Sequence, residues 1–297
     1  IYANLLRYPY LAASHSDAAL AHIGPPFASR RRTPCESAVA CNGCRIIMPV
    51  NSIISISTCY PKPINFDFLR EVMLHMKQSV EKYREWLRKE LAKIGVTVDD
   101  GMFDMLSRYY DMVIERNEVM NLTAITEPAD FVVKHFLDCA YLAAVTDIHG
   151  KSIIDVGTGA GFPGMVLKII FSDTHIVLLD SLKKRVDFLN EVINGLELSD
   201  ITAFHGRAEE FGQDDSFRES FDLCVSRAVS DLTVLSELCI PLVKVGGSFV
   251  AYKSVEARDE LTRSKKAILT LGGEKKDVKT FSIFHPDTNE IFEGILW

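Results

Sequence analysis

The feature that most constrains the fold is a glycine-rich turn directly after an apolar strand pattern, in residues 153–164. The segment reads Ile-Ile-Asp-Val-Gly-Thr-Gly-Ala-Gly-Phe-Pro-Gly, and its first two glycines are Gly157 and Gly159. Glycine has no Cβ and tolerates positive φ, so such a turn lets the backbone approach a ligand closely. Open α/β sheets bind ligands in a crevice at the carboxyl ends of their strands. The segment therefore predicts an α/β protein that binds a nucleotide or a nucleoside derivative.

Two kinds of binding site compete for this turn. Residues 159–164 match GxGxxG, the fingerprint of NAD(P)-dependent oxidoreductases, whose helix N-terminus faces a pyrophosphate. Asp155, however, stands two residues before the first glycine, and Asp-x-Gly-x-Gly-x-Gly is typical of S-adenosylmethionine (SAM) sites. In a SAM site a carboxylate can pair with the cationic methionine end of the ligand. Beside the negative pyrophosphate of a dinucleotide, a carboxylate gains no such attraction. We favour SAM, and keep the oxidoreductase and a turn without a ligand as alternatives.

The bulk properties of the chain exclude several classes of protein. Its 297 residues are 47% hydrophobic, enough for one large or two small domains with a real core. The net charge is −7, so any RNA binding would rely on a local basic patch. No apolar run is long enough to span a membrane, and no signal-peptide pattern is present. Three of the seven cysteines lie in apolar patterns, as suits free thiols in a reducing compartment, so we expect a cytoplasmic protein.

Residues 1–75 differ from the rest of the chain. They lack a sustained helical or strand period and hold four cysteines and few acids. We expect a disordered or non-native leader, with the natural start at Met76, close to where helix-like sequence begins. Cys41 and Cys44 resemble half a zinc ribbon, but no second pair stands at ribbon spacing. No metal site is therefore predicted.

The remaining residues divide into two predicted regions. Residues 76–149 contain helical patterns and predict an N-terminal helical cap, with helices over 77–91, 103–119 and about 127–144. In residues 150–297 strands and helices alternate, which predicts a mostly parallel, doubly wound sheet. The predicted strands are 151–156, 175–180, 201–205, 221–226, 247–253 and about 277–283. The predicted helices are 162–171, 183–195, 231–243 and 256–270.

Charged residues follow the second predicted strand. Asp180 ends that strand a little over 20 residues beyond the glycines, the spacing at which a carboxylate contacts ribose hydroxyls. A helix N-cap is the alternative role for Asp180, and both roles can hold. Lys183, Lys184 and Arg185 then begin a helix, where cations are unfavourable to the helix dipole. Their position suggests a phosphate partner, although a solvated face is nearly as good an explanation.

The third strand leads into a loop that would meet the adenine ring in a SAM site. In this loop Ala208 would supply a backbone N–H and Glu209 an acidic neighbour to the ring. Arg207 is a further candidate for a phosphate contact. Alternatively, the acidic residues only begin a helical turn.

The end of the fourth strand, Ser226-Arg227-Ala228, would face the methyl acceptor. Amino-group methylases carry Asn/Asp-Pro-Pro-aromatic here, and C5 pyrimidine methylases need a nucleophilic cysteine. Neither device is present, because Cys224 lies inside the strand, where a buried inert thiol is expected. The acceptor should therefore be nucleophilic without deprotonation, as guanine N7 is, with proximity and orientation as the main contribution. No residue is a certain catalyst, and Arg227 is a candidate electrostatic contact.

Several motifs together resemble the RsmG (GidB) family of bacterial methyltransferases. They are Asn121-Leu122-Thr123, Lys134-His135-Phe136-Leu137-Asp138, the glycine turn with Asp155, Leu179-Asp180-Ser181 with Lys184-Arg185, and Ser226-Arg227-Ala228. The resemblance implies a class I SAM-dependent methyltransferase with a Rossmann-like sheet, acting on guanine N7 of 16S ribosomal RNA in the small subunit.

The resemblance also implies particular contacts. SAM, and the product S-adenosylhomocysteine (SAH), would be held by Gly157, Phe162, Ala208, Glu209 and Arg227. Lys134 and His135 would lie near the RNA by analogy, although His135 by itself resembles a satisfied structural histidine.

Two further expectations complete the sequence-based picture. The tail after Thr280 differs from the final hairpin of the family, so a C-terminal strand is expected to be missing and the sheet edge unpaired. No feature predicts a membrane or protein partner, and we expect a monomer. A non-catalytic RNA-binding module in ribosome assembly is the alternative to an enzyme.

Overall fold

The computed structural model describes residues 80–227 and 230–297. The predicted leader, its start at Met76 and the Cys41–Cys44 pair lie outside the described residues. Among the described residues, no helix combines the length and apolar content needed to cross a membrane.

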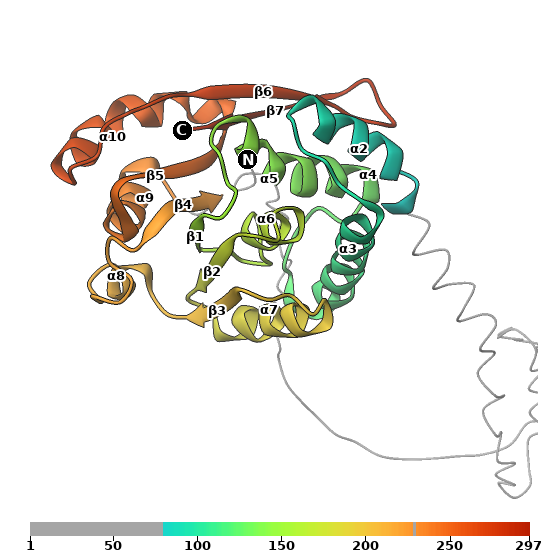
Figure 1. Ribbon diagram of the computed structural model, residues 1–297. Helices are drawn as coiled ribbons and strands as arrows, with labels where there is room; N and C mark the ends of the chain where they lie inside the picture. Colours follow the sequence, from blue (N-terminus) through green and yellow to red (C-terminus); the bar gives the residue numbers. More distant parts are fainter. Residues whose placement is uncertain (1–79, 228–229) are drawn as a thin grey trace, which may run out of the picture. The chain divides into compact units, whose positions relative to one another are not determined.

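A mixed sheet forms the centre of the described residues (Figure 1). Its strands are β1 (Ser152–Val156), β2 (His175–Asp180), β3 (Ile201–His205), β4 (Phe221–Arg227), β5 (Val243–Ser254), β6 (Lys279–Phe284) and β7 (Ile291–Leu296). In space the order is β3-β2-β1-β4-β5-β7-β6. The first five strands are parallel, and β7 is antiparallel to both of its neighbours. The strand order reverses between β1 and β4, the place where doubly wound sheets open a crevice.

The expectation of a missing C-terminal strand is wrong. β6 and β7 form a hairpin in continuous register from Phe284 opposite Ile291 to Lys279 opposite Leu296. β7 also pairs with β5, where Leu296 lies opposite Tyr252. The sequence signal was weak because Gly294 interrupts the apolar pattern of β7. That glycine is buried, and a Cβ at its position would come within 2.3 Å of Cζ of Phe281 in β6.

Because the ring of Phe281 occupies the space beside Gly294, we expect Gly294→Val to lower the free energy of unfolding by about 1–3 kcal/mol. Chemical denaturation followed by circular dichroism measures this loss. Glu293→Val is the matched control, because Glu293 is the neighbouring exposed residue on the same strand and should change stability little. Equal stability of the two variants would show that the hairpin does not depend on this contact.

Two layers of helices cover the sheet. The helices of the first face are α2 (Arg84–Lys93), α3 (Asp100–Met120), α6 (Gly164–Ile170), α7 (Lys183–Gly195) and the helical segment 128–144. Those associated with the second face are α8 (Ala208–Phe211), α9 (Leu232–Cys239), η3 (Ile240–Leu242), η4 (Val255–Ala257) and α10 (Arg258–Thr270), of which α10 packs on α9. The alternation along β1 explains the two layers: Ile153 packs into the core of the first face and Ile154 into that of the second.

The segment 128–144 is one continuous run of helix with an unusual centre. It consists of α4 (Pro128–Phe131), the π-helix η1 (Val132–Leu137), α5 (Asp138–Ala140) and the 3₁₀-helix η2 (Tyr141–Ala144). The sequence predicts the bounds of this run but not the π-turn. π-turns are rare and occur mostly at functional sites.

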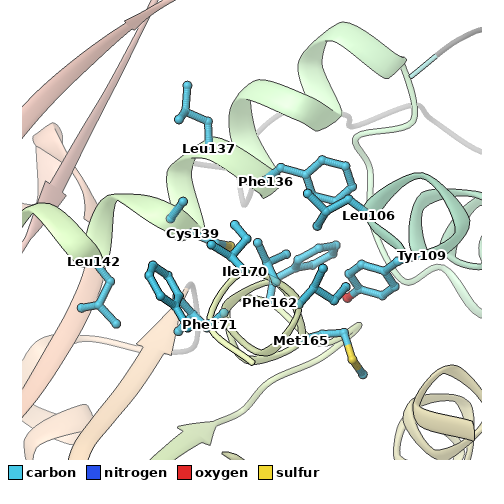
Figure 2. Packing of buried hydrophobic residues seen from close by; sticks show 14 of the residues in the cluster. Leu106, Tyr109, Phe136, Leu137, Cys139, Leu142, Phe162, Met165, Ile170 and Phe171 are labelled. Carbon is cyan, nitrogen blue, oxygen red and sulfur yellow. The ribbon is translucent and has the colours of Figure 1, made fainter. Parts of the chain in front are cut away.

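The largest core lies where α3 and segment 128–144 cover α6. Figure 2 shows their side chains converging around this helix, including Tyr109, Phe136, Cys139, Phe162 and Met165. Every residue of α6 is buried. The helix that follows the glycine turn is therefore enclosed by the sheet on one side and the cap helices on the other.

Candidate functional site

A hollow of about 220 Å³ opens at the carboxyl ends of β1, β2 and β3. It is lined by Val156, Gly157, Leu179, Asp180, Ser181, Gly206, Arg207, Ala208, Glu209 and Leu238. The structure therefore brings together four of the predicted SAM-contacting residues, Gly157, Asp180, Ala208 and Glu209. They come from three separate strand ends, which meet because parallel strands finish at the same edge of the sheet.

The glycine turn begins at the hollow, where Gly157 lines it. Gly157, Gly159 and Gly161 all have positive φ, at 72°, 64° and 108°. The turn is anchored to β2, because the Gly157 N–H donates to the carbonyl of Leu179 at 2.8 Å. The conformation thus requires glycine, as the sequence pattern indicates.

Asp155 lies beneath the turn rather than in the hollow. Its side chain is fully buried, and Oδ2 accepts hydrogen bonds from the Thr158 hydroxyl at 2.6 Å and the Gly164 N–H at 2.8 Å. Oδ1 has no hydrogen-bond partner among the described residues. The carboxyl group therefore braces both ends of the glycine turn, and its pairing with the methionine end of SAM stays a prediction.

Burial raises the pKa of Asp155 to about 6, which predicts a pH-dependent stability. An unfolded Asp has a pKa of about 3.9, so between the two values the folded protein binds the additional proton. We therefore expect this carboxyl group to lower the free energy of unfolding by about 2–3 kcal/mol as the pH rises through 6. Denaturation curves from pH 4 to pH 7 measure the slope.

Asp155→Asn should flatten that dependence, because the amide cannot ionise. Asp215→Asn is the control, since Asp215 is exposed and its replacement should leave the slope unchanged. An unchanged slope in Asp155→Asn would assign the pH dependence to another group.

Asp180 is buried at the end of β2, on the edge of the hollow. Its Oδ1 accepts from the Leu182 N–H at 2.8 Å, and Oδ2 from the Gly159 N–H at 3.0 Å and Arg185 Nη1 at 3.3 Å. An ionised carboxylate has about four acceptor sites. Asp180 thus supports the local backbone and retains capacity for one further hydrogen bond.

The loop after β3 carries an exposed ion pair. Arg207 Nη2 lies 2.9 Å from Glu209 Oε1, with both side chains exposed, while Ala208 is buried in the wall of the hollow. Such exposed pairs are worth little and exchange partners easily. Glu209 is therefore free to face a ligand, and Arg207 a phosphate, at small cost.

Arg227 does not line the hollow. It joins the end of β4 to the cap helices: Nη1 donates to the Lys134 carbonyl at 2.7 Å and to Asp138 Oδ2 at 3.1 Å, and Nη2 lies 3.0 Å from Nδ1 of His135. Only 15% of the side chain is exposed. The guanidinium also lies over the ring of Phe162, with Cζ 5.1 Å from the ring centroid. Arg227 is therefore the centre of a buried network.

His135 is held in this network as a neutral ring. Burial lowers its pKa well below the usual value. Nδ1 lies 3.0 Å from Arg227, which can only donate, and 3.2 Å from the Lys134 carbonyl; the shorter contact to the cation assigns Nδ1 as the acceptor, so that Nε2 carries the proton and donates to the Thr123 hydroxyl at 2.9 Å. The ring stacks on Phe162, with centroids 4.2 Å apart. His135 is thus a satisfied structural histidine, and Phe162 is a buried core residue beside the site.

The predicted RNA-contacting cations differ in their surroundings. Lys183 and Lys184 are exposed at the start of α7, and Lys183 pairs with Asp187. Arg185 turns back to Asp180 and is only partly exposed. Lys134 is half-buried and pairs with Asp130 at 2.6 Å. Arg185 and Lys134 are therefore already engaged by carboxylates.

Sequence reasoning missed the part played by Asp138 and Thr123, although both stood within quoted motifs. An acid among the apolar residues of 136–140 is a signal that a cation must lie nearby, because an isolated buried charge is costly. Cys224 behaves as expected: it is fully buried, and burial raises the pKa of its thiol well above the usual value.

The sheet and the hollow define the class of protein. A dinucleotide-binding fold has the strand order 3-2-1-4-5-6. Here an antiparallel β7 is inserted between β5 and β6, and a hollow opens at the ends of β1, β2 and β3. This is the Rossmann-like fold of class I methyltransferases, and it does not favour the oxidoreductase alternative.

Comparisons with known proteins identify the family. The family model described as rRNA small subunit methyltransferase G matches residues 102–287. The protein named ribosomal RNA small subunit methyltransferase G from Lachnoclostridium phytofermentans is 48% identical over 200 residues, 67% of this chain and 82% of that protein. The protein of the same name from Acetivibrio thermocellus is 44% identical over 208 residues, 70% of this chain and 86% of that protein. The chain belongs to the rRNA small subunit methyltransferase G family, and the resemblance to RsmG is confirmed.

Similarity to solved structures is more distant. The precorrin-6y C5,15-methyltransferase from Geobacter metallireducens aligns with a TM-score of 0.40 and 12% identity, over 60% of this chain and 90% of that chain. This similarity is too low to bear on function.

Proposed function

We propose that this chain transfers the methyl group of SAM to guanine N7 of 16S rRNA in the small ribosomal subunit, releasing SAH. Membership of the rRNA small subunit methyltransferase G family is the observation that carries this proposal. We further propose the cytoplasm as its location, a monomeric state, and a division into a helical cap of residues 76–149 and a SAM-binding domain of residues 150–297.

The hollow fits a nucleoside with a charged tail. Asp180 has one acceptor site left, which we assign to a ribose hydroxyl, and we assign Ala208 and Glu209, which line the same hollow, to the adenine ring. The glycine turn presents backbone without side chains. Beneath it, the Asp155 carboxyl group has one buried oxygen without a hydrogen-bond partner among the described residues. Bound SAM supplies the methyl group in activated form.

The residues at the end of β4 fit an acceptor that needs no general base. The Ser226 hydroxyl donates to the Val156 carbonyl at 2.8 Å, and Asp138 is paired with Arg227. Both nitrogens of His135 are engaged, and the thiol of Cys224 is buried. None of these groups is available to remove a proton or to attack a base. Guanine N7 has a free lone pair, so the chain needs only to position it and exclude water.

Transfer from labelled SAM to small subunits that lack the modification tests this function. Reduction followed by aniline cleaves RNA at guanines methylated on N7. Cleavage of the labelled 16S rRNA by this treatment would therefore assign the methyl group to guanine N7. Fully modified subunits are the control and should accept no label, and naked 16S rRNA distinguishes free RNA from the assembled subunit as substrate. SAH binding without transfer to either substrate would favour the non-catalytic assembly module. NADH binding without SAH binding would favour an oxidoreductase.

The start of α7 gives a second prediction for this function. Because Lys183 and Lys184 are exposed and lie outside the hollow, Lys183→Ala with Lys184→Ala should weaken RNA binding and leave SAH affinity unchanged. The slope of the logarithm of the RNA-binding constant against the logarithm of the salt concentration should become shallower by about 1–2, since each lost phosphate contact removes about 0.7–0.9 from it. Arg185 is left intact because its pairing with Asp180 supports the glycine turn.

The control for that experiment is Lys89→Ala with Lys93→Ala, which removes two exposed lysines from α2. RNA titrations at several salt concentrations and SAH titrations by calorimetry separate the two effects. If the Lys183 and Lys184 variant loses SAH binding and RNA binding to the same extent, these lysines are not specific contacts to RNA phosphates.

A further inference from the structure

One segment of the chain has a charge opposite to that of its surroundings. Residues 261–279 hold six Lys and Arg and two acids, whereas the other described residues hold 19 Lys and Arg and 34 Asp and Glu. We define the α10 basic surface by Arg263, Lys265 and Lys266 on α10 together with Lys275, Lys276 and Lys279 in the segment that follows the helix, all of them exposed. Local concentration of cations in an acidic protein is the electrostatic footprint of a polyanion partner.

The cations of α10 lie on its outer face. Its inner face packs on α9, and Ser264 is fully buried there. On the outer face a shallow open groove is lined by Thr262, Arg263, Lys265, Lys266, Leu269 and Thr270. Lysine and threonine three to four residues apart share one side of a helix, so ammonium and hydroxyl donors stand together along the groove.

Most of this charge is not neutralised. Within residues 80–227 and 230–297, Lys265, Lys266, Lys275 and Lys276 have no ion-pair partner. Arg263 pairs with Asp231 at 3.2 Å and Lys279 with Asp277 at 3.3 Å, but all four side chains are exposed, so both pairs are weak. Adjacent uncompensated cations repel one another, and a line of phosphates would relieve that repulsion.

The surface fits nucleic acid better than a lipid bilayer. Helices that lie on membranes bury an apolar face in the lipid. Here the apolar face of α10 is used against the protein, and Leu269 is the exposed large hydrophobic residue of its outer face. The recognising groups are therefore cations and hydroxyls, which suit phosphate oxygens.

We propose that the α10 basic surface is a second RNA-contacting surface, which binds the phosphate backbone of the substrate RNA away from the methylated base. This inference rests on the proposed function. In the chain α7 connects β2 to the edge strand β3, whereas α10 connects β5 to the opposite edge strand β6, so the two cationic regions lie toward opposite ends of the sheet (Figure 1). A large folded RNA can contact both, whereas a small substrate cannot.

The test compares Lys265→Ala with Lys266→Ala against the wild type and against the α2 control pair at Lys89 and Lys93. We expect the salt slope for 16S rRNA binding to become shallower by about 1–2 and the KM for unmodified small subunits to rise several-fold. The value of kcat at saturating subunits and the affinity for SAH should stay unchanged, because α10 does not line the hollow.

The outcomes separate this inference from the proposed function. If the wild type methylates small subunits and the α10 variant matches the control pair in slope and KM, the surface assignment is overturned while the function stands. If the wild type transfers no methyl group to RNA, the proposed function itself fails. If the variant keeps its RNA affinity but loses binding to vesicles with 20% phosphatidylserine, the surface belongs to a membrane and the RNA assignment is overturned.

Discussion

Arg227→Met should lower the free energy of unfolding by about 3–5 kcal/mol, because it strands a buried carboxylate. Asp138 is 9% exposed, and burial raises its pKa, which Arg227 opposes. The substitution also removes the donors to the Lys134 carbonyl and to Nδ1 of His135. Urea denaturation monitored by circular dichroism measures the loss.

Two further variants test the cause of that loss. Arg263→Met removes a surface ion pair and should cost less than about 1 kcal/mol. Arg227→Met combined with Asp138→Asn removes the stranded charge as well and should recover part of the stability. If Arg227→Met alone costs no more than the surface control, the network does not hold the cap on the sheet.

Gly161→Ala is expected to cost about 2–5 kcal/mol and to weaken SAH binding at least about tenfold, combining backbone strain and steric overlap. Its φ is 108°, and an added Cβ would lie 2.6 Å from the Tyr109 hydroxyl oxygen and 3.0 Å from the Met165 Cβ. The Tyr109 hydroxyl donates to the carbonyl of Ala160 within the turn at 2.6 Å, so its displacement would distort the wall of the hollow. Denaturation and SAH calorimetry measure the two effects.

Two glycines separate the contributions. Gly95 has φ of 77° with nothing within 4 Å of an added Cβ, so Gly95→Ala should cost only the backbone term of about 1–2 kcal/mol and leave SAH binding intact. Gly164→Ala measures the steric contribution alone, because Gly164 has no positive φ. Its added Cβ would lie 2.3 Å from Leu178 Cδ2 and 2.9 Å from Asp155 Oδ2. Equal stabilities of Gly161→Ala and Gly95→Ala would show that the turn relaxes without cost.

Much of the fold could be predicted because its elements have strong local patterns. The predicted helix over 183–195 agrees with α7, and the predicted strands 175–180 and 201–205 agree with β2 and β3. These segments are bounded by turn residues, and apolar periodicity decides their type. β7 was missed because its apolar pattern is interrupted by Gly294, whose role depends on a ring from another strand.

The candidate site likewise contains residues whose positions could be predicted and residues whose surroundings could not. Gly157, Asp180, Ala208 and Glu209 line one hollow because strand ends converge in any parallel sheet. Their contacts with SAM stay predictions. Phe162 and Arg227 lie in buried contacts with the cap helices, which the sequence did not predict, and their contacts with SAM also stay predictions. No local pattern reports which helix will cover a residue.

The sequence by itself determined the alternation of strands and helices, the glycine turn that requires positive φ, and the family, because these depend on local residue order. Tertiary structure alone decided that Asp155 braces the turn, that His135 is a neutral link between Arg227 and Thr123, and that a π-turn interrupts segment 128–144. Burial, tautomer and ion pairing are set by neighbours far apart in the chain. The charge reversal at residues 261–279 is visible in the sequence, but the exposure of Arg263, Lys265 and Lys266 on the outer face of α10 follows from packing against α9.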